Sequence, residues 1–174
     1  DALSHSPGLM TGTAGTGAIA CLLAHTGGLP RHEADAIIQE AARRLDRPEP
    51  PARPGMWEGA TGQAVFWLLA DLLSFIPGSR HRARSLLIQD AAQLATLVPP
   101  HAGGLDGRLG WLAVVAALEG LTKLTVPTDL KESMRPAPSA STAGSSVRNG
   151  AIGSLLALSV LRLAGSPLPD VEQV

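Results

Sequence analysis

Four apolar segments stand out along the chain because almost every position in them is hydrophobic. They are Ala18–Ala24, Ala64–Leu73, Trp111–Leu118 and Leu155–Leu163. A helix that is apolar on all sides is stable only when other elements surround it. We therefore expect these segments to form an inner layer of four buried helices.

Two further segments place apolar residues at helical spacing, with charged residues between them. Arg31–Leu45 does so with Ala34, Ile37, Ile38, Ala41, Ala42 and Leu45, and His81–Val98 does so with Leu87, Ala91, Leu94 and Val98. This periodicity predicts amphipathic outer helices, and Asp129–Met134 is long enough for a third, short one. No stretch alternates as a strand would, so we predict an all-α fold.

A glycine pattern, [G/S]-x-x-x-G-x-x-G, precedes each apolar segment. It occurs at Gly8–Gly15, Gly55–Gly62, Gly103–Gly110 and Ser146–Gly153. Its central glycines, at positions 12, 59, 107 and 150, are 47, 48 and 43 residues apart. A period of this length indicates stacked supersecondary units. We expect one domain over residues 1–174, with repeats at about 5–50, 51–100, 101–145 and 146–174, arranged as an α/α toroid-like array of helical hairpins.

Composition narrows the class of protein further. The chain has 174 residues, a formal net charge of −1, 3% aromatic residues and no Tyr. A nucleic-acid surface needs a basic face, so we expect no nucleic-acid partner. We also expect no membrane span, because the apolar runs are shorter than about 20 residues. The single cysteine favours a cytoplasmic location. The chain begins with Asp1 rather than Met, so we expect a fragment or a processed product.

The residues just before the central glycines are the candidate site residues, because the amino ends of the inner helices would meet at one rim. They are Thr11, Trp57, Glu58, Asp106, Arg148 and Asn149. Two loop histidines, His5 and His101, precede glycine motifs and could reach the same rim. The alternative is that the Thr, Asp and Asn residues among them only cap the helices.

Metal and nucleotide sites are not expected. Thr11–Gly17 is similar to a nucleotide-binding glycine loop, but no strand precedes it and the pattern recurs between helices. Cys21 lies inside a predicted buried helix, where a cysteine is usually a core residue. The five histidines form no metal-ligand motif. The basic run at Arg80, Arg82 and Arg84 is expected to be a solvated helix start, although it could meet an acidic peptide.

The segment Pro7–Gly17 resembles the glycine repeat of the lanthionine synthetase C-like family, the cyclases of lanthipeptide biosynthesis. Gly55–Leu73, Gly103–Leu121 and Ser146–Leu163 fit the other repeats of that family more loosely. The family folds as an α/α toroid of seven repeats. At about 47 residues a repeat, this chain holds fewer than four, which implies part of a synthetase or a shortened relative.

The resemblance implies a reaction in which a peptide cysteine adds to dehydroalanine or dehydrobutyrine and forms a thioether ring. Many members bind zinc through a Cys-His pair before a repeat glycine. Here Arg148 and Asn149 occupy the positions of that Cys-His pair before Gly150, so the zinc ligands of the family have no counterpart in this motif. The kinase-lyase-cyclase fusions are similar in lacking these ligands. The resemblance therefore implies a cyclase that needs no zinc or other cofactor.

Under this interpretation each candidate residue has a role. Glu58, Asp106 or His101 acts as base or acid, and Arg148 and Asn149 stabilise the enolate oxygen. Thr11, Trp57 and His5 would contact the substrate. The implied partners are a dehydrated precursor peptide with its leader, and a fused or associated kinase/lyase or dehydratase domain.

Two alternatives remain open. The domain could be a non-catalytic scaffold that binds the precursor or a partner enzyme. It could also be another α/α-toroid enzyme, such as a six-hairpin glycosidase or a terpene cyclase. Those sites use paired carboxylates or Asp-rich motifs with an aromatic lining, and this chain has no Tyr and no DDxxD motif.

Overall fold

The computed structural model describes residues 8–9, 12–46, 54–97 and 107–135. These residues contain six α-helices and no strand. The helices are α1 (Thr13–His25), α2 (Arg31–Leu45), α3 (Ala60–Leu72), α4 (Arg80–Leu97), α5 (Arg108–Thr122) and α6 (Thr128–Ser133). The all-α prediction is confirmed for this part of the chain. The fourth predicted inner helix, Leu155–Leu163, lies outside the described residues.

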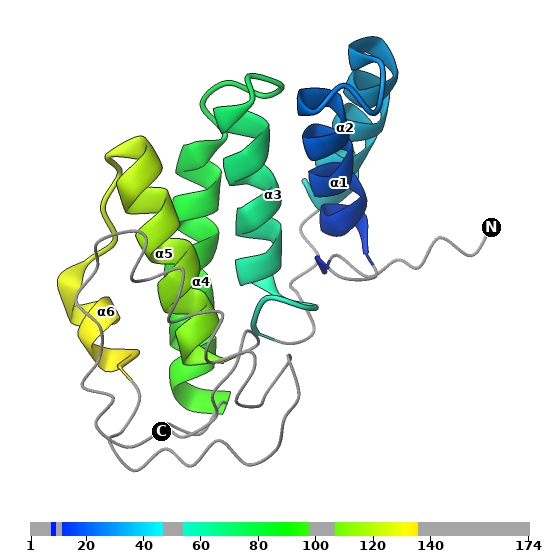
Figure 1. Cartoon of the computed structure of the whole chain (residues 1–174). Helices are drawn as coiled ribbons and strands as arrows, with labels where there is room; N and C mark the ends of the chain where they lie inside the picture. Colours follow the sequence, from blue (N-terminus) through cyan, green and yellow to red (C-terminus); the bar gives the residue numbers. More distant parts are fainter. Residues whose placement is uncertain (1–7, 10–11, 47–53, 98–106, 136–174) are drawn as a thin grey trace.

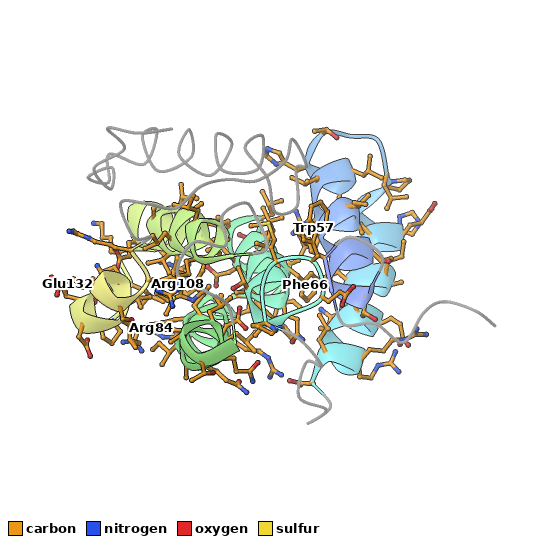
Figure 2. The ribbon with its side chains drawn as sticks, turned by 90° about the horizontal axis from the view of Figure 1, so that it is seen from below. Trp57, Phe66, Arg84, Arg108 and Glu132 are labelled. Carbon is orange, nitrogen blue, oxygen red and sulfur yellow. The ribbon has the colours of Figure 1, made fainter. Side chains whose placement is uncertain are left out.

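Helices α1 and α2 pair into one hairpin and α3 and α4 into a second, and α5 with the short α6 follows beside them (Figure 1). The odd-numbered helices form one layer, in which α1 contacts α3 and α3 contacts α5. Helices α2 and α4 lie behind α1 and α3, and α6 contacts α4 (Figure 2). The amino ends of α1, α3 and α5 point to the same end of the molecule. The predicted inner and outer layers are therefore both present.

The core lies between the two layers. Its largest buried side chains are Phe66 on α3, Trp111 on α5, and Ile38 and Leu87 on the outer helices. Phe66 packs where α1 is narrowest, because a Cβ on Gly17 would overlap the Phe66 ring and meet the Cβ of Ala41. The small residues of the first hairpin thus make room for an aromatic residue of the second.

Polar groups close the turn between α3 and α4. Asp71 is buried near the end of α3, accepts a hydrogen bond from the backbone N–H of Gly78 and pairs with Arg80. The Ser79 hydroxyl donates to the backbone carbonyl oxygens of Trp67 and Ile76, at 2.8 and 2.7 Å. A buried carboxylate is stable only when it is paired in this way. The first residues of the basic run therefore hold a turn rather than forming a free surface.

Two arginines connect the first hairpin to the second. Arg82 of α4 pairs with Asp46, donates to the carbonyl oxygen of Leu45 at 3.2 Å, and lies over the Trp67 ring. Arg31 of α2 donates to the Ser74 carbonyl oxygen at 3.1 Å and lies over the Phe75 ring. Each guanidinium combines a hydrogen bond with an aromatic face, which Arg does better than Lys.

The expectation of full burial is wrong for one face of α1. Ile19, Leu22 and Leu23 are 59%, 47% and 43% exposed, although α1 contains no Asp, Glu, Lys or Arg. The opposite face, with Ala14, Ala18 and Cys21, is buried. Helix α1 stands at the edge of the described array, so only its inward side has helices to pack against. No helix in the described ranges is long and apolar enough to cross a membrane.

Candidate functional site

Each of the three described inner helices begins at the central glycine of its motif. Gly12, Gly59 and Gly107 are the N-cap residues of α1, α3 and α5, and none makes a side-chain capping bond. Their backbones are nearly the same, with φ of −122°, −107° and −108° and ψ of −171°, −171° and −160°. The N-cap position itself is thus a glycine in these three helices, and the alternative of capping by Thr11 and Asp106 concerns residues outside the described ones.

The glycine loop has one geometry in the first two repeats. The backbone N–H of Gly15 donates to the carbonyl oxygen of Gly8, and that of Gly62 donates to Gly55, both at 3.3 Å. A Cβ on Gly15 would overlap the carbonyl oxygen of Leu9, and a Cβ on Gly62 would overlap that of Met56. The third glycine is thus required because the loop backbone folds directly over the first turn of the helix.

The first two loops are in direct contact. A Cβ on Gly8 would overlap the Trp57 carbonyl oxygen and lie against the Cα of Glu58. A Cβ on Gly62 would meet the Cβ of Leu9, which also belongs to the first loop. The loops therefore pack backbone against backbone, and two of the four predicted glycine loops converge.

Two of the eight predicted site residues lie in the described part of the chain. Trp57 and Glu58 are half-buried in the loop before α3, at its contact with the first loop. Figure 2 shows Trp57 between α3 and α1. The other six lie outside the described residues; they are His5, Thr11, His101, Asp106, Arg148 and Asn149.

Sequence reasoning missed Asp90, which fixes the second glycine loop. Asp90 lies on α4 and is fully buried. Its Oδ2 accepts hydrogen bonds from the backbone N–H groups of Gly55 and Thr61, each at 3.1 Å, and from the Thr61 hydroxyl. The Thr61 N–H belongs to the first turn of α3, where N–H groups have no partner within the helix. Asp90 therefore caps α3 from the neighbouring helix.

A signal for Asp90 was present in the spacing of α4. Ala83, Leu87, Asp90 and Leu94 follow the inward positions i, i+4, i+7 and i+11, and all four are buried. An acid at an inward position needs a partner. In α2 the same register reads Ala34, Ile38, Ala41 and Leu45, so alanine replaces the acid.

The start of α5 is held by different contacts. Arg108, the first residue of α5, is largely buried and donates to the Ser133 carbonyl oxygen of α6 at 3.1 Å. The indole N–H of Trp111 donates to the Leu87 carbonyl oxygen on α4 at 2.8 Å. Glu119 accepts from the N–H of Val126 at 2.8 Å and from Lys131 at 3.0 Å, which secures the link to α6. The Trp111 bond thus connects α5 to the second hairpin, and the other bonds connect α5 to α6 and to the segment before it.

Cys21 is a core residue, as predicted. It is fully buried in α1, and burial raises the pKa of its thiol from 9.0 to about 11. A reactive cysteine has a lowered pKa and an accessible sulfur, so Cys21 has neither property. Within the described ranges, no group of three or more His, Cys, Asp or Glu side chains is placed to hold a metal ion.

The described site is therefore a rim of helix amino ends with paired glycine loops, one half-buried acid and one half-buried indole. The amino end of a helix carries a partial positive charge, and at α3 the Asp90 carboxylate already accepts from the Thr61 N–H of that end. Comparisons of this chain with protein-family models, curated proteins and solved structures gave no match.

Proposed function

We propose that this chain is a cyclase domain of lanthipeptide biosynthesis, built on an α/α toroid-like array, and that it forms thioether rings without zinc. The observation that carries the proposal is the convergence of two glycine loops of one geometry at the amino ends of α1 and α3. The segment Pro7–Gly17, which resembles the glycine repeat of the cyclase family, contains the first of these two loops.

The chemistry needs a base, an acid and stabilisation of an enolate. The thiol proton leaves to a base, the sulfur bonds to the β-carbon of the dehydro residue, and the α-carbon then takes a proton. Glu58 is the described residue that we assign to proton transfer, because it is a half-buried carboxyl at the loop contact. Helix amino ends would favour the enolate oxygen. Trp57 would contact apolar parts of the peptide.

The test uses a peptide that contains one dehydroalanine and one cysteine, incubated with the full chain. Ring closure leaves the peptide mass unchanged and removes the free thiol, so thiol labelling followed by mass spectrometry measures it. We expect ring formation faster than in a control without protein, and we expect Glu58→Gln to slow it about 100-fold. Glu132→Gln, at an exposed position on α6, is the matched control. A ring-closure rate equal to the control without protein would contradict catalysis.

A peptide-binding scaffold is the second candidate function. It is favoured by the fact that Asp90 and Asp71, the buried carboxyls among the described residues, both hold backbone turns. A scaffold would bind the same peptide without changing the rate of ring closure. Fluorescence anisotropy of a labelled peptide, measured beside the ring-closure assay, separates the two functions.

A further inference from the structure

The loop that carries Trp57 and Glu58 is closed by a single oxygen atom. Oδ2 of Asp90 accepts hydrogen bonds from the backbone N–H groups of Gly55 and Thr61, each at 3.1 Å. A chain of this length would span about 20 Å if it were extended, so the shared acceptor draws the two ends of the loop together. The Thr61 hydroxyl donates to the same oxygen. We call Asp90 and Thr61 the loop clamp, because they fix the loop at both ends.

The anchor of this loop belongs to a different helix. Asp90 lies on α4 and is fully buried, whereas the loop precedes α3. Helices α3 and α4 pack against each other and form the second hairpin. Hydrogen bonds to a carboxylate are about twice as strong as those between neutral groups, and a buried position shields them from water. The loop is therefore held to the body of the hairpin as well as to its own helix.

The first glycine loop restricts the same residues from another side. A Cβ on Gly8 would overlap the carbonyl oxygen of Trp57 and lie 2.7 Å from the Cα of Glu58. The backbone at these two residues therefore has no room to shift toward Gly8. The Glu58 residue is half-buried, so a ligand can still reach its side chain. An acid or base needs this combination of a fixed backbone and an accessible carboxyl in order to meet its substrate in one geometry.

The loop clamp distinguishes Glu58 from the other candidate carboxyl, Asp106. Counted from the central glycine, the third repeat has Leu109 where the second has Thr61, so the third lacks the hydroxyl. The first repeat has Ala14 at this position and no carboxyl just before its central glycine. Of the four glycine motifs, the second therefore combines an acid before the central glycine with a threonine two residues after it.

We propose that Asp90 is a positioning residue for Glu58, and that it acts by holding the loop from which Glu58 transfers a proton. The inference rests on the proposed function, in which Glu58 is assigned to proton transfer. Asp90 is fully buried and acts through the loop rather than by touching the peptide. Loosening the loop would let the Glu58 carboxyl move, and a misplacement of about 1 Å can slow a reaction about 100-fold.

The first experiment measures whether Asp90 acts through Glu58. Asp90→Asn keeps the shape of the side chain and one acceptor oxygen but loses the carboxylate. We expect this variant to close the ring about tenfold more slowly than the natural chain in the thiol-labelling assay. In a chain that already carries Glu58→Gln, the same substitution should slow ring closure less than about twofold, because the group that it positions is gone. Equal slowing in both chains would overturn the proposal, since a purely structural role does not need Glu58.

Asp71→Asn is the matched control, because it removes the other buried carboxylate of the described residues, near the opposite end of α3. Asp71 holds the backbone N–H of Gly78 rather than the glycine loop. This control should lower stability but change the rate of ring closure less than about twofold. A slowing as large as that of Asp90→Asn would overturn the proposal.

Hydrogen exchange tests the loop clamp without any reaction. In native conditions, the amides of residues 55–61 should exchange at least about tenfold faster in Asp90→Asn than in the natural chain, and at the natural rate in Asp71→Asn. Unchanged exchange in Asp90→Asn would overturn the proposal whether or not rings form. A natural chain that closes no rings would contradict the proposed function, and faster exchange in Asp90→Asn would then still support the loop clamp.

Discussion

The first hairpin, α1–α2, and the second, α3–α4, start with the same glycine loop but secure it differently. In the second hairpin, Asp90 holds Gly55 and Thr61 through buried hydrogen bonds. In the first, the positions of Thr61 and Asp90 are taken by Ala14 and Ala41, both buried. The second hairpin thus has both members of a buried polar pair and the first has neither. A buried polar group without its partner would lower stability more than an apolar pair does.

The comparison shows that the loop needs its glycines in both hairpins but needs the buried acid in one. The second hairpin packs against neighbours on both sides, through α1 and α5, and must place its loop against the first loop. The first hairpin has a described neighbour on one side only. The Asp90 hydrogen bonds therefore fix the loop of the hairpin that packs against neighbours on both sides.

The largest expected effect is the loss of the Asp90 carboxyl. Asp90→Ala leaves three donors without their acceptor, the N–H groups of Gly55 and Thr61 and the Thr61 hydroxyl. We expect the free energy of unfolding to fall by about 3–5 kcal/mol in urea denaturation. Adding Thr61→Ala recreates the apolar pair of the first hairpin, and the double variant should lose less than the sum of the single ones by about 1 kcal/mol or more. Strict additivity would contradict the pairing.

Removal of the third glycine should be costly in both hairpins. Gly15→Ala and Gly62→Ala each place a Cβ on a loop carbonyl oxygen, of Leu9 and Met56 respectively. We expect each to lower the free energy of unfolding by about 2–3 kcal/mol. Gly120→Ala is the control, because nothing lies within 4 Å of its Cβ position on α5. It should raise stability by up to about 1 kcal/mol. If only one of the two glycine variants lost stability, the two loops would not be equivalent.

The bridge made by Arg82 should contribute less. Arg82→Lys keeps the charge near Asp46 but loses the planar contact with the Trp67 ring. Because 40% of the Arg82 side chain is exposed, we expect a loss of about 1 kcal/mol in thermal or urea unfolding. Arg43→Lys, in an exposed pair with Glu40 within α2, should change stability by less than about 0.5 kcal/mol. Equal losses of stability in Arg82→Lys and Arg43→Lys would show that the Arg82 contacts between the hairpins do not contribute to stability.

A dependence on pH is also expected in the first hairpin. The Cys21 thiol has a pKa of about 11 when folded and 9.0 ordinarily, so the unfolded chain loses this proton first. Stability from this group is complete below pH 9 and is lost as the pH rises from 9 to 11. Urea unfolding of the natural chain and of Cys21→Ala at pH 8 and pH 10 measures the difference. A natural chain that loses no more stability than the variant would contradict this shift.

The helices could be predicted because their signals are local. Arg31–Leu45 was expected from its 3.6-residue period and is observed with those bounds as α2. The starts of α1, α3 and α5 follow from the glycine motif, although the glycine itself is the cap. Local patterns of this kind depend on residues within one or two turns.

The features that sequence reasoning missed depend on distant partners. Asp90 is 29 residues from Thr61, so its inward position in α4 indicates that it needs a partner but does not identify that partner. The exposure of Ile19 depends on whether another hairpin lies beside α1, which the composition of α1 does not encode. For the candidate site, the sequence placed Trp57 and Glu58 at a glycine loop. Their position beside Gly8 follows only from the packing of two repeats.

The burial of Cys21 has a consequence for measuring cooperativity. The single cysteine of the chain lies in the first hairpin, and the three tryptophans, Trp57, Trp67 and Trp111, all lie beyond it. Thiol exchange in native conditions therefore reports opening of one end of the array, and tryptophan fluorescence reports the remainder. In an array whose units interact only with their neighbours, these two opening energies can differ. The natural chain thus contains separate reporters for whether its hairpins unfold together or one at a time.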